Sequence, residues 1–490
     1  MREAVLAHYF GANYITDGFV LAYQIPYLIL SFFVGATATT YISINAGLRQ
    51  EEKNRFFSNI ITIFLLLSTA LTLLLVLLPR PFISLLSSSD IKPETRVVAN
   101  QLLRYMGLAT IPLLLASILS AQLQVSGKFF IATAYQIFNN IFIIIGIVFA
   151  HTFSFLPWMG IGMTIGNTLS LFVLILFNRD PSLQYRPLID CHDPHLRQFF
   201  ILLTPMILST LVGEVNAIVD RRMASSLDEG TVSVLNYASK VNGVFSAIIG
   251  MSVGTAFFPR MSEFAQSNDI DGMKDQTALG IRIILPILLP LTIGIIILAQ
   301  PLIRILLERR EFNREATIRT AQCLQMFVIG LFAVNLNQII TRAFYARKKT
   351  RLPAILSAVS VALNIICILV LIGPLGARGP ALATSISGTA LLLGLRLFLR
   401  KDIGDLHIYD KPEWLKLFLA TGIMSISIFA ISRFVPFMTT SYFVCALMLG
   451  GTVLGAILLY AGVLIVTKSE VASLVIGMVQ SVISKKRTKT

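Results

Sequence analysis

Apolar stretches of about 20 residues recur from one end of this chain to the other, separated by short polar connections. A stretch of this kind is long enough to cross a bilayer as a helix, whereas a lone strand in lipid would leave its backbone groups unpaired. Hydrophobic residues make up 55% of the 490 residues, which is more apolar surface than one soluble core can bury. The chain is therefore predicted to be an all-α polytopic membrane protein.

Lysine and arginine gather in alternate connections between the apolar stretches. The net charge of +15 therefore reflects the bias that keeps basic loops on the cytoplasmic side, and we expect no nucleic-acid partner. The same bias predicts that the N-terminus and the C-terminus are both cytoplasmic. An exception is a basic patch in an outer connection, made of Arg309, Arg310, Arg314 and Arg319.

An internal repeat organises the chain. Residues 78–86 resemble residues 298–306, so that Pro81 aligns with Pro301 at an offset of 220 residues. Several other pairs follow in order at nearly the same offset, which predicts two six-helix bundles inserted in the same sense. We expect an N-terminal bundle at 1–183, a cytoplasmic linker at 184–199, a C-terminal bundle at 200–402, and two further transmembrane helices with a basic amphipathic tail at 403–490. With a truncated first helix, the total is about 14 transmembrane helices.

Charged residues inside the apolar stretch 211–264 are the main functional candidates, because an ionisable group at bilayer depth usually faces a wet cavity or a partner. Glu214, Asp220, Arg221 and Arg222 precede a turn, and Lys240 follows it. The repeat places the first residues of the chain on the matching helices of the other bundle. The predicted substrate-binding residues facing one central cavity are Arg2, Asp17, Lys240, Arg221 and Arg222.

Basic residues outnumber acidic residues in this set, so the predicted cavity attracts an anion. The guanidinium fork of arginine matches phosphate oxygens, which favours a phosphate-bearing cargo. In an alternative interpretation, Arg221 and Arg222 pair with Asp220 and Glu214 and only hold the helix ends, and these two acids are otherwise candidates for ion coupling.

Nothing in the sequence indicates a cofactor or a metal. Cys191, His192 and His195 lie in a polar linker, where such a cluster is more often solvated than bound to zinc. We find no phosphate-binding glycine loop of the ATPase type. We therefore expect no catalytic residue, no metal and no cofactor, with transport coupled to the membrane potential or to an ion.

Several short motifs along the chain are similar to those of one known family. They are Arg2-Glu3, Phe10-Gly11-Ala12, Thr16-Asp17-Gly18-Phe19, Asn236-Tyr237-Ala238-Ser239-Lys240, Pro259-Arg260-Met261-Ser262, Glu308 to Phe312, and Phe344-Tyr345-Ala346 with Thr350-Arg351 and Pro353. At these residues the chain resembles the MurJ/MviN family of lipid II flippases, in the superfamily of multidrug, oligosaccharidyl-lipid and polysaccharide exporters.

The resemblance implies a multi-pass protein of the bacterial plasma membrane that carries lipid II, the undecaprenyl-pyrophosphate-linked peptidoglycan precursor, outward by alternating access for cell-wall synthesis. It also implies that Arg2, Asp17 and Lys240 are charged cavity residues, with Lys240 where arginine is usual. Leu30-Ser31 departs from members that carry two arginines there, and the family's first helix begins about twenty residues earlier, where it includes another arginine that this chain lacks.

We therefore predict a transporter and not an enzyme, with a lipid-linked glycan and membrane lipids as partners and cell-wall synthesis proteins as further partners. Four alternatives stay open. The cargo could be another polyprenyl-linked polysaccharide unit, or the chain could be a cation-coupled multidrug exporter that uses Glu214 and Asp220. The chain could also be a membrane enzyme that transfers glycans from the same carriers, or a scaffold that transports nothing.

Overall fold

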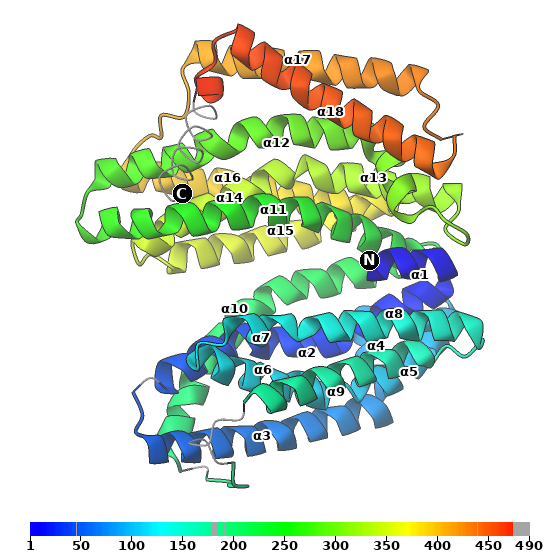
Figure 1. Ribbon diagram of the computed structural model, residues 1–490, viewed down its shortest axis with the longest axis vertical. Coiled ribbons are helices and arrows are strands. Elements are labelled where there is room, and N and C mark those ends of the chain that lie inside the picture. The colour runs from blue at the N-terminus through cyan, green and yellow to red at the C-terminus, as the bar shows by residue number, and fades with distance from the viewer. Residues whose placement is uncertain (46, 179–184, 191, 439, 474–490) are drawn as a thin grey trace, which may run out of the picture. The chain divides into compact units, whose positions relative to one another are not determined.

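A computed structural model of the chain describes residues 1–45, 47–178, 185–190, 192–438 and 440–473. The regular elements within these residues are helices, which Figure 1 labels. In chain order they are α1 (Arg2–Phe10), α2 (Tyr14–Asn45), α3 (Gln50–Leu77), α4 (Pro79–Leu86), α5 (Pro93–Gly107), α6 (Thr110–Val125), α7 (Phe129–Ala134), α8 (Gln136–Thr152), α9 (Trp158–Phe177), α10 (Pro194–Ala224), α11 (Thr231–Gln266), α12 (Ile270–Leu307), α13 (Arg314–Ile329), α14 (Leu331–Ala346), α15 (Arg351–Leu375), α16 (Arg378–Ile403), α17 (Lys411–Phe434) and α18 (Tyr442–Val466).

By length and composition, 10 helices in the described part of the chain can cross a membrane, or 11 if the pair α5 and α6, bent by 45°, forms one span. The prediction of an all-α polytopic membrane protein is confirmed, while the total of about 14 spans stays a prediction. The bend falls at Leu108-Ala109, just before Pro112, because proline cannot donate a hydrogen bond to the carbonyl four residues earlier. α1 has 9 residues and is too short to cross a bilayer.

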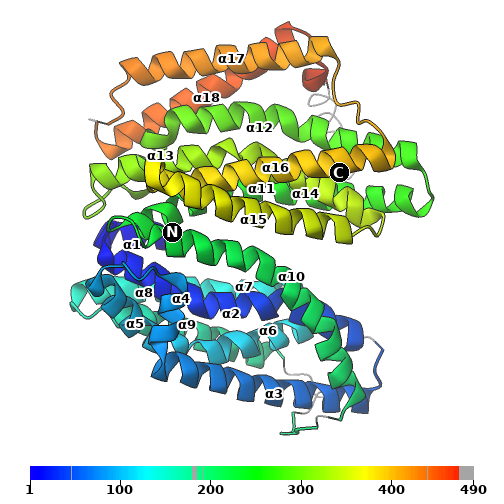
Figure 2. The same cartoon turned by 180° about the vertical axis from the view of Figure 1, so that it is seen from behind.

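The chain forms two compact units. The first contains Met1–Val234 and Arg309–Ala316, and the second contains Leu235–Glu308 and the residues from Thr317 onward. α10 belongs to the first unit because it packs along α2, as Figure 2 shows. The two compact units are defined by contacts, whereas the predicted boundaries at 183, 200 and 402 follow from the sequence repeat. These boundaries therefore stay predictions. The chain leaves the first unit within the first turn of α11.

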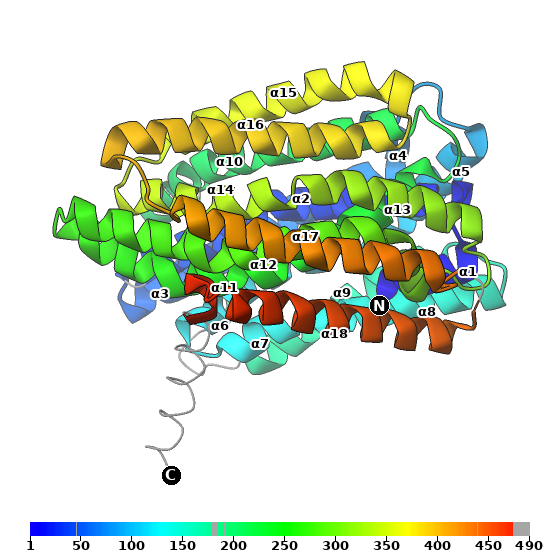
Figure 3. The same ribbon diagram turned by 90° about the horizontal axis from the view of Figure 1, so that it is seen from above.

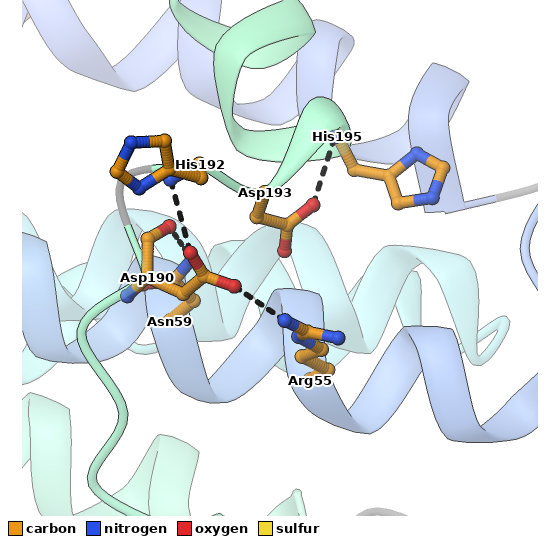
Figure 4. A network of polar contacts seen from close by, with 6 residues as sticks. All are labelled: Arg55, Asn59, Asp190, His192, Asp193 and His195. Atoms are coloured by element: carbon orange, nitrogen blue, oxygen red, sulfur yellow. Dashed lines mark hydrogen bonds and ion pairs between the residues drawn. The ribbon is translucent and has the colours of Figure 1, made fainter.

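The polar linker of the first unit is bound to α3 (Figure 4). Asn59 and the backbone of Asp190 exchange two hydrogen bonds of 2.8 and 3.0 Å, and Arg55 pairs with the Asp190 carboxylate. Asp193 caps α10 by accepting a hydrogen bond of 2.8 Å from the amide of His195. These bonds fix the path of the chain into α10.

The same linker contains Cys191, His192 and His195, the residues considered above as zinc ligands. Cys191 lies outside the described residues, and Figure 4 shows the imidazoles of His192 and His195 on opposite sides of Asp193. Among the described residues, no three His, Cys, Asp or Glu side chains are grouped so as to hold a metal ion.

In the second unit, α17 and α18 lie side by side and both pack on α12 (Figure 3). Buried Arg304 joins the C-terminal end of α12 to the connection that follows α17. Its guanidinium pairs with Glu308 at 3.3 Å and donates to the backbone carbonyls of Phe437 and, at 2.7 Å, Thr440. A buried arginine with several acceptors keeps this end of the two additional helices in place.

Candidate functional site

Asp17 lies in the first turn of α2 and binds the beginning of α11. Its buried carboxylate accepts hydrogen bonds from the amide of Gly230 at 2.7 Å, from the amide of Ser233 at 2.8 Å and from the Ser233 hydroxyl at 2.6 Å. The free amides of a helix N-terminus favour a negative charge, so Asp17 acts as a cap for a helix that begins 214 residues further along the chain. The first turn of α11 is thereby attached to α2.

Glu229 caps α2 in return. Its carboxylate accepts a hydrogen bond of 3.0 Å from the amide of Tyr14, the first residue of α2. Gly230 has a φ of +79°, and a Cβ there would lie 2.4 Å from the carbonyl oxygen of Ala12, so no other residue fits this turn without strain. We call Tyr14, Asp17, Glu229, Gly230 and Ser233 the cap cluster.

Lys92, in the connection before α5, donates a hydrogen bond of 2.7 Å to the other oxygen of Glu229. This bond lowers the pKa of Glu229 below its usual value. The bond therefore stabilises the fold at pH values above the glutamate pKa of the unfolded chain, about 4.3, and this contribution disappears as the pH falls through the lowered pKa of the folded state.

We expect Glu229→Gln to unfold at a slightly lower temperature than the parent protein at pH 7, and at nearly the same temperature under acid conditions. The effect is small because both side chains are partly exposed and screened by solvent. Thermal unfolding measured across this pH range tests the prediction, with Glu51→Gln, at an exposed position in the first helical turn of α3, as the control. Parallel pH profiles for the parent protein and Glu229→Gln would contradict it.

Two of the predicted arginines meet on the next turns of α2. The guanidinium of Arg2 lies over the ring of Tyr23, 4.1 Å from its centre, and bonds to Glu3. Arg221 of α10 donates a hydrogen bond of 2.9 Å to Gln24, the next residue of α2. Tyr23 follows Asp17 by six residues, so this pair lies about 9 Å deeper than the cap cluster along α2.

The other charged candidates of α10 lie apart from this pair. Arg222 is exposed and donates to the backbone carbonyl of Ser84 in α4 at 3.2 Å. Among the described residues, neither Arg221 nor Arg222 forms an ion pair with Glu214 or Asp220. Asp220 does not face its neighbours Arg221 and Arg222 on the helix, and Glu214 lies two turns before Arg221, about 10 Å away along the axis, so the alternative of an ion pair within α10 is not observed. One oxygen of Asp220 is buried and has no hydrogen-bond partner.

Lys240 belongs to the second unit. It is exposed on α11, six residues after the chain leaves the first unit at Val234. The cap cluster fixes the first turn of the same helix, so any movement of α11 about that turn carries Lys240 with it. The predicted set is therefore divided between Arg2, Asp17 and Arg221 in one unit and Lys240 in the other.

An apolar cavity of about 410 Å³ lies within the second unit, between α11, α12, α17 and α18. Pro286, Pro290 and Gly294 of α12 form one wall, while Ile428 of α17 and Tyr460 of α18 are among the residues opposite. Small and proline residues leave room along α12, and the walls are almost entirely hydrocarbon. Such a cavity is suited to a lipid chain rather than to a polar group.

The sequence did not reveal the partners of Asp17. Asp228-Glu229-Gly230 is typical of a turn, but nothing in these residue types indicates that the amides of the turn face α2. A usable signal is the position of two acids: Asp17 lies in the first turn of α2, and Glu229 lies two residues before the start of α11. Acids are favoured at helix N-termini.

The chain is similar to known proteins over nearly its full length. A family profile described as "Lipid II flippase MurJ" matches residues 6–452. A probable lipid II flippase MurJ of Thermotoga maritima is 27% identical over 427 residues, covering 86% of this chain and 85% of the relative. One of Rickettsia prowazekii is 27% identical over 477 residues, covering 94% and 93%.

Solved structures agree with these similarities. A structure of the lipid II flippase MurJ in an inward closed conformation matches with a TM-score of 0.80 and 27% identity, covering 94% of each chain. An inward-facing multidrug resistance MATE family transporter matches with a TM-score of 0.65 and 15% identity, covering 82% of this chain and 95% of that one. At 15% identity, this second match concerns the fold alone.

Proposed function

The chain belongs to the lipid II flippase MurJ family, and we propose that it carries lipid II from the cytoplasmic to the outer leaflet of the bacterial plasma membrane. The family resemblance noted in the sequence is thus confirmed, and the chain is a transporter rather than an enzyme. Its cargo is a lipid-linked glycan, and membrane lipids surround it. The residues that hold the cargo, the orientation of the chain and the coupling are proposals.

We propose that Arg2, Arg221 and Lys240 bind the pyrophosphate. The observation that carries this proposal is that Arg2 and Arg221 contact adjacent residues of α2, with Arg2 partly buried against an aromatic ring. Guanidinium groups bind phosphate oxygens strongly where little water competes. Exposed Lys240 supplies a further positive charge from the second unit, and exposed Arg222 helps to bind the pyrophosphate.

The polyprenyl chain of the cargo would occupy the apolar cavity between α12, α17 and α18. Each buried methylene contributes about 0.8 kcal/mol, so a cavity lined by hydrocarbon favours an isoprenoid over a headgroup. A lipid-linked pyrophosphate needs both kinds of surface, and each compact unit supplies one of them.

Asp17 has a different role in this proposal. By capping α11 it holds one conformation, and release of the cap frees the helix that carries Lys240. A switch of this type needs only a modest difference in free energy between the two states. Glu214 and Asp220 are the candidates for coupling to an ion. One oxygen of the Asp220 carboxylate is buried and has no hydrogen-bond partner.

Both termini are proposed to be cytoplasmic. Most of the basic amphipathic tail, 474–490, lies outside the described residues. In that orientation an inside-negative membrane potential favours outward movement of a negative cargo by about 2.3 kcal/mol per charge per 100 mV. No cofactor is needed for this coupling. Cell-wall synthesis proteins are proposed as the partners that deliver lipid II and consume it.

The test is the amount of lipid II exposed on the outer face of cells as this protein is depleted, measured with an external reagent that modifies only exposed lipid II. We expect exposure to fall while the cytoplasmic pool rises, and to recover when the protein is expressed again. Unchanged exposure in cells without another flippase would contradict the proposal and favour a different polyprenyl-linked glycan.

A further inference from the structure

α12 contains three prolines, of which Pro286 and Pro290 lie in its membrane-spanning middle, and each of these two leaves one backbone carbonyl without its helical donor. Because proline has no N–H, Pro286 cannot bond to the carbonyl of Arg282, and Pro290 cannot bond to the carbonyl of Pro286. An unsatisfied carbonyl is costly in an apolar surrounding, so each needs a donor from outside the helix.

Both carbonyls receive a tyrosine hydroxyl from the last part of the chain. Tyr460 of α18 donates a hydrogen bond of 2.9 Å to the carbonyl of Pro286. Tyr409, in the connection between α16 and α17, donates one of 2.5 Å to the carbonyl of Arg282. The two hydroxyls thus meet the two carbonyls that the prolines leave free.

Further contacts hold the tyrosines in position. Tyr409 is buried, and this burial raises the pKa of its hydroxyl, so the group stays a donor at physiological pH. Arg282 donates a hydrogen bond of 2.6 Å to the carbonyl of His407, two residues from Tyr409. The connection and the middle of α12 are therefore bound in both directions.

The first half of the chain provides an internal comparison. At the offset of 220 residues given by Pro81 and Pro301, the positions of Pro286 and Pro290 correspond to Leu66 and Ala70 of α3. α3 has no proline between Gln50 and Leu77, so its carbonyls keep their helical donors. The prolines and the tyrosines that serve them occur together, in the half that carries the two additional helices.

We propose that Tyr409 and Tyr460 are positioning residues that set the bend of α12 and thereby the shape of the apolar cavity during transport. Pro286, Pro290 and Tyr460 all line that cavity, so a change in the bend changes its wall. The α17 and α18 helices then act as a support for the proline-containing helix. This inference rests on the proposed transport of a lipid-linked cargo.

The test pairs each tyrosine with its own proline in the full-length protein. Tyr460→Phe keeps the ring but removes the donor, and we expect the unfolding temperature to fall by about 2 °C and transport of lipid II in proteoliposomes to fall about fivefold. Adding Pro290→Ala restores an N–H for the same carbonyl and should recover the unfolding temperature. Pro286→Ala should rescue Tyr409→Phe in the same way.

The crossed pairs are the controls. Each is compared with its proline variant alone: Tyr460→Phe should lower the unfolding temperature as much in the Pro286→Ala background as in the parent protein, and hardly at all in the Pro290→Ala background. Tyr345→Phe, on an exposed part of α14, should change nothing. The bend is measured as the distance between spin labels at exposed Ile270 and Leu306, in a variant whose native cysteines are replaced. Pro290→Ala should lengthen this distance and lower transport although it stabilises the helix.

Equal rescue by matched and crossed prolines would overturn the pairing of hydroxyls with carbonyls. An unchanged label distance and unchanged transport in the double variant Tyr409→Phe, Tyr460→Phe would overturn the positioning role. If the parent protein moves no lipid II, the proposed function fails instead, and the rescue pattern in the unfolding temperatures still decides whether the pairing exists.

Discussion

Replacing Arg2 and Lys240 together by alanine is expected to lower lipid II transport by about 100-fold or more, while the protein still inserts and folds. Each hydrogen bond to a charged group contributes about 1.5–3 kcal/mol, and 1.4 kcal/mol corresponds to a factor of ten. Arg2 and Lys240 belong to different compact units, so the double variant removes charge from both. Transport in proteoliposomes is the measurement.

The control for this experiment removes the same amount of charge elsewhere. Lys401 and Lys411 are exposed at the ends of α16 and α17, and replacing both by alanine should leave transport nearly unchanged. The exchange of Arg2 for lysine and Lys240 for arginine keeps the charge and should retain much of the activity, with some loss at Arg2 because lysine lacks the planar fork. Full transport by the double alanine variant would remove both residues from the proposed pyrophosphate site.

The class of fold was predictable because the bilayer imposes a simple requirement on sequence. A helix that crosses it must be apolar over its whole length, so the spans are visible without knowledge of their packing. Charges within those spans are rare and costly, which is why the sequence points to Arg221 and Lys240, and the internal repeat then adds Arg2 and Asp17. The exact ends and breaks of the helices depend on local contacts, so they are harder to predict from the sequence.

The partners of the selected residues were not predictable in the same way. Asp17 binds amides more than 200 residues away, and a backbone amide carries no mark in the sequence. Arg221 was expected either in a cavity or beside Asp220, yet it donates to Gln24 of another helix. The prolines of α12 show in the sequence which carbonyls lack a helical donor. Only the packing of the last helices identifies the hydroxyls of Tyr409 and Tyr460 as the donors that replace the missing N–H groups.

The second large effect is expected at Asp17. Asp17→Ala removes the acceptor of three hydrogen bonds in a buried place and leaves the amides of Gly230 and Ser233 unsatisfied. An unsatisfied buried donor costs about 1–3 kcal/mol, so we expect a loss of about 3 kcal/mol or more in the free energy of unfolding, together with loss of transport. Thermal unfolding of the purified protein and transport in proteoliposomes are measured on the same samples.

A graded series decides between the two roles considered for Asp17. Ser233→Ala removes the hydroxyl donor and should cost about 1 kcal/mol, while Asp17→Asn keeps a single acceptor oxygen and should lie between Ser233→Ala and Asp17→Ala. If Asp17 caps α11, stability and transport fall together along this series, because both depend on the attachment of that helix. If transport is lost in Asp17→Asn and Asp17→Ala while the unfolding temperature of both matches the parent protein, the carboxylate acts on the cargo or on its coupling, and the cap is not what transport requires of this residue.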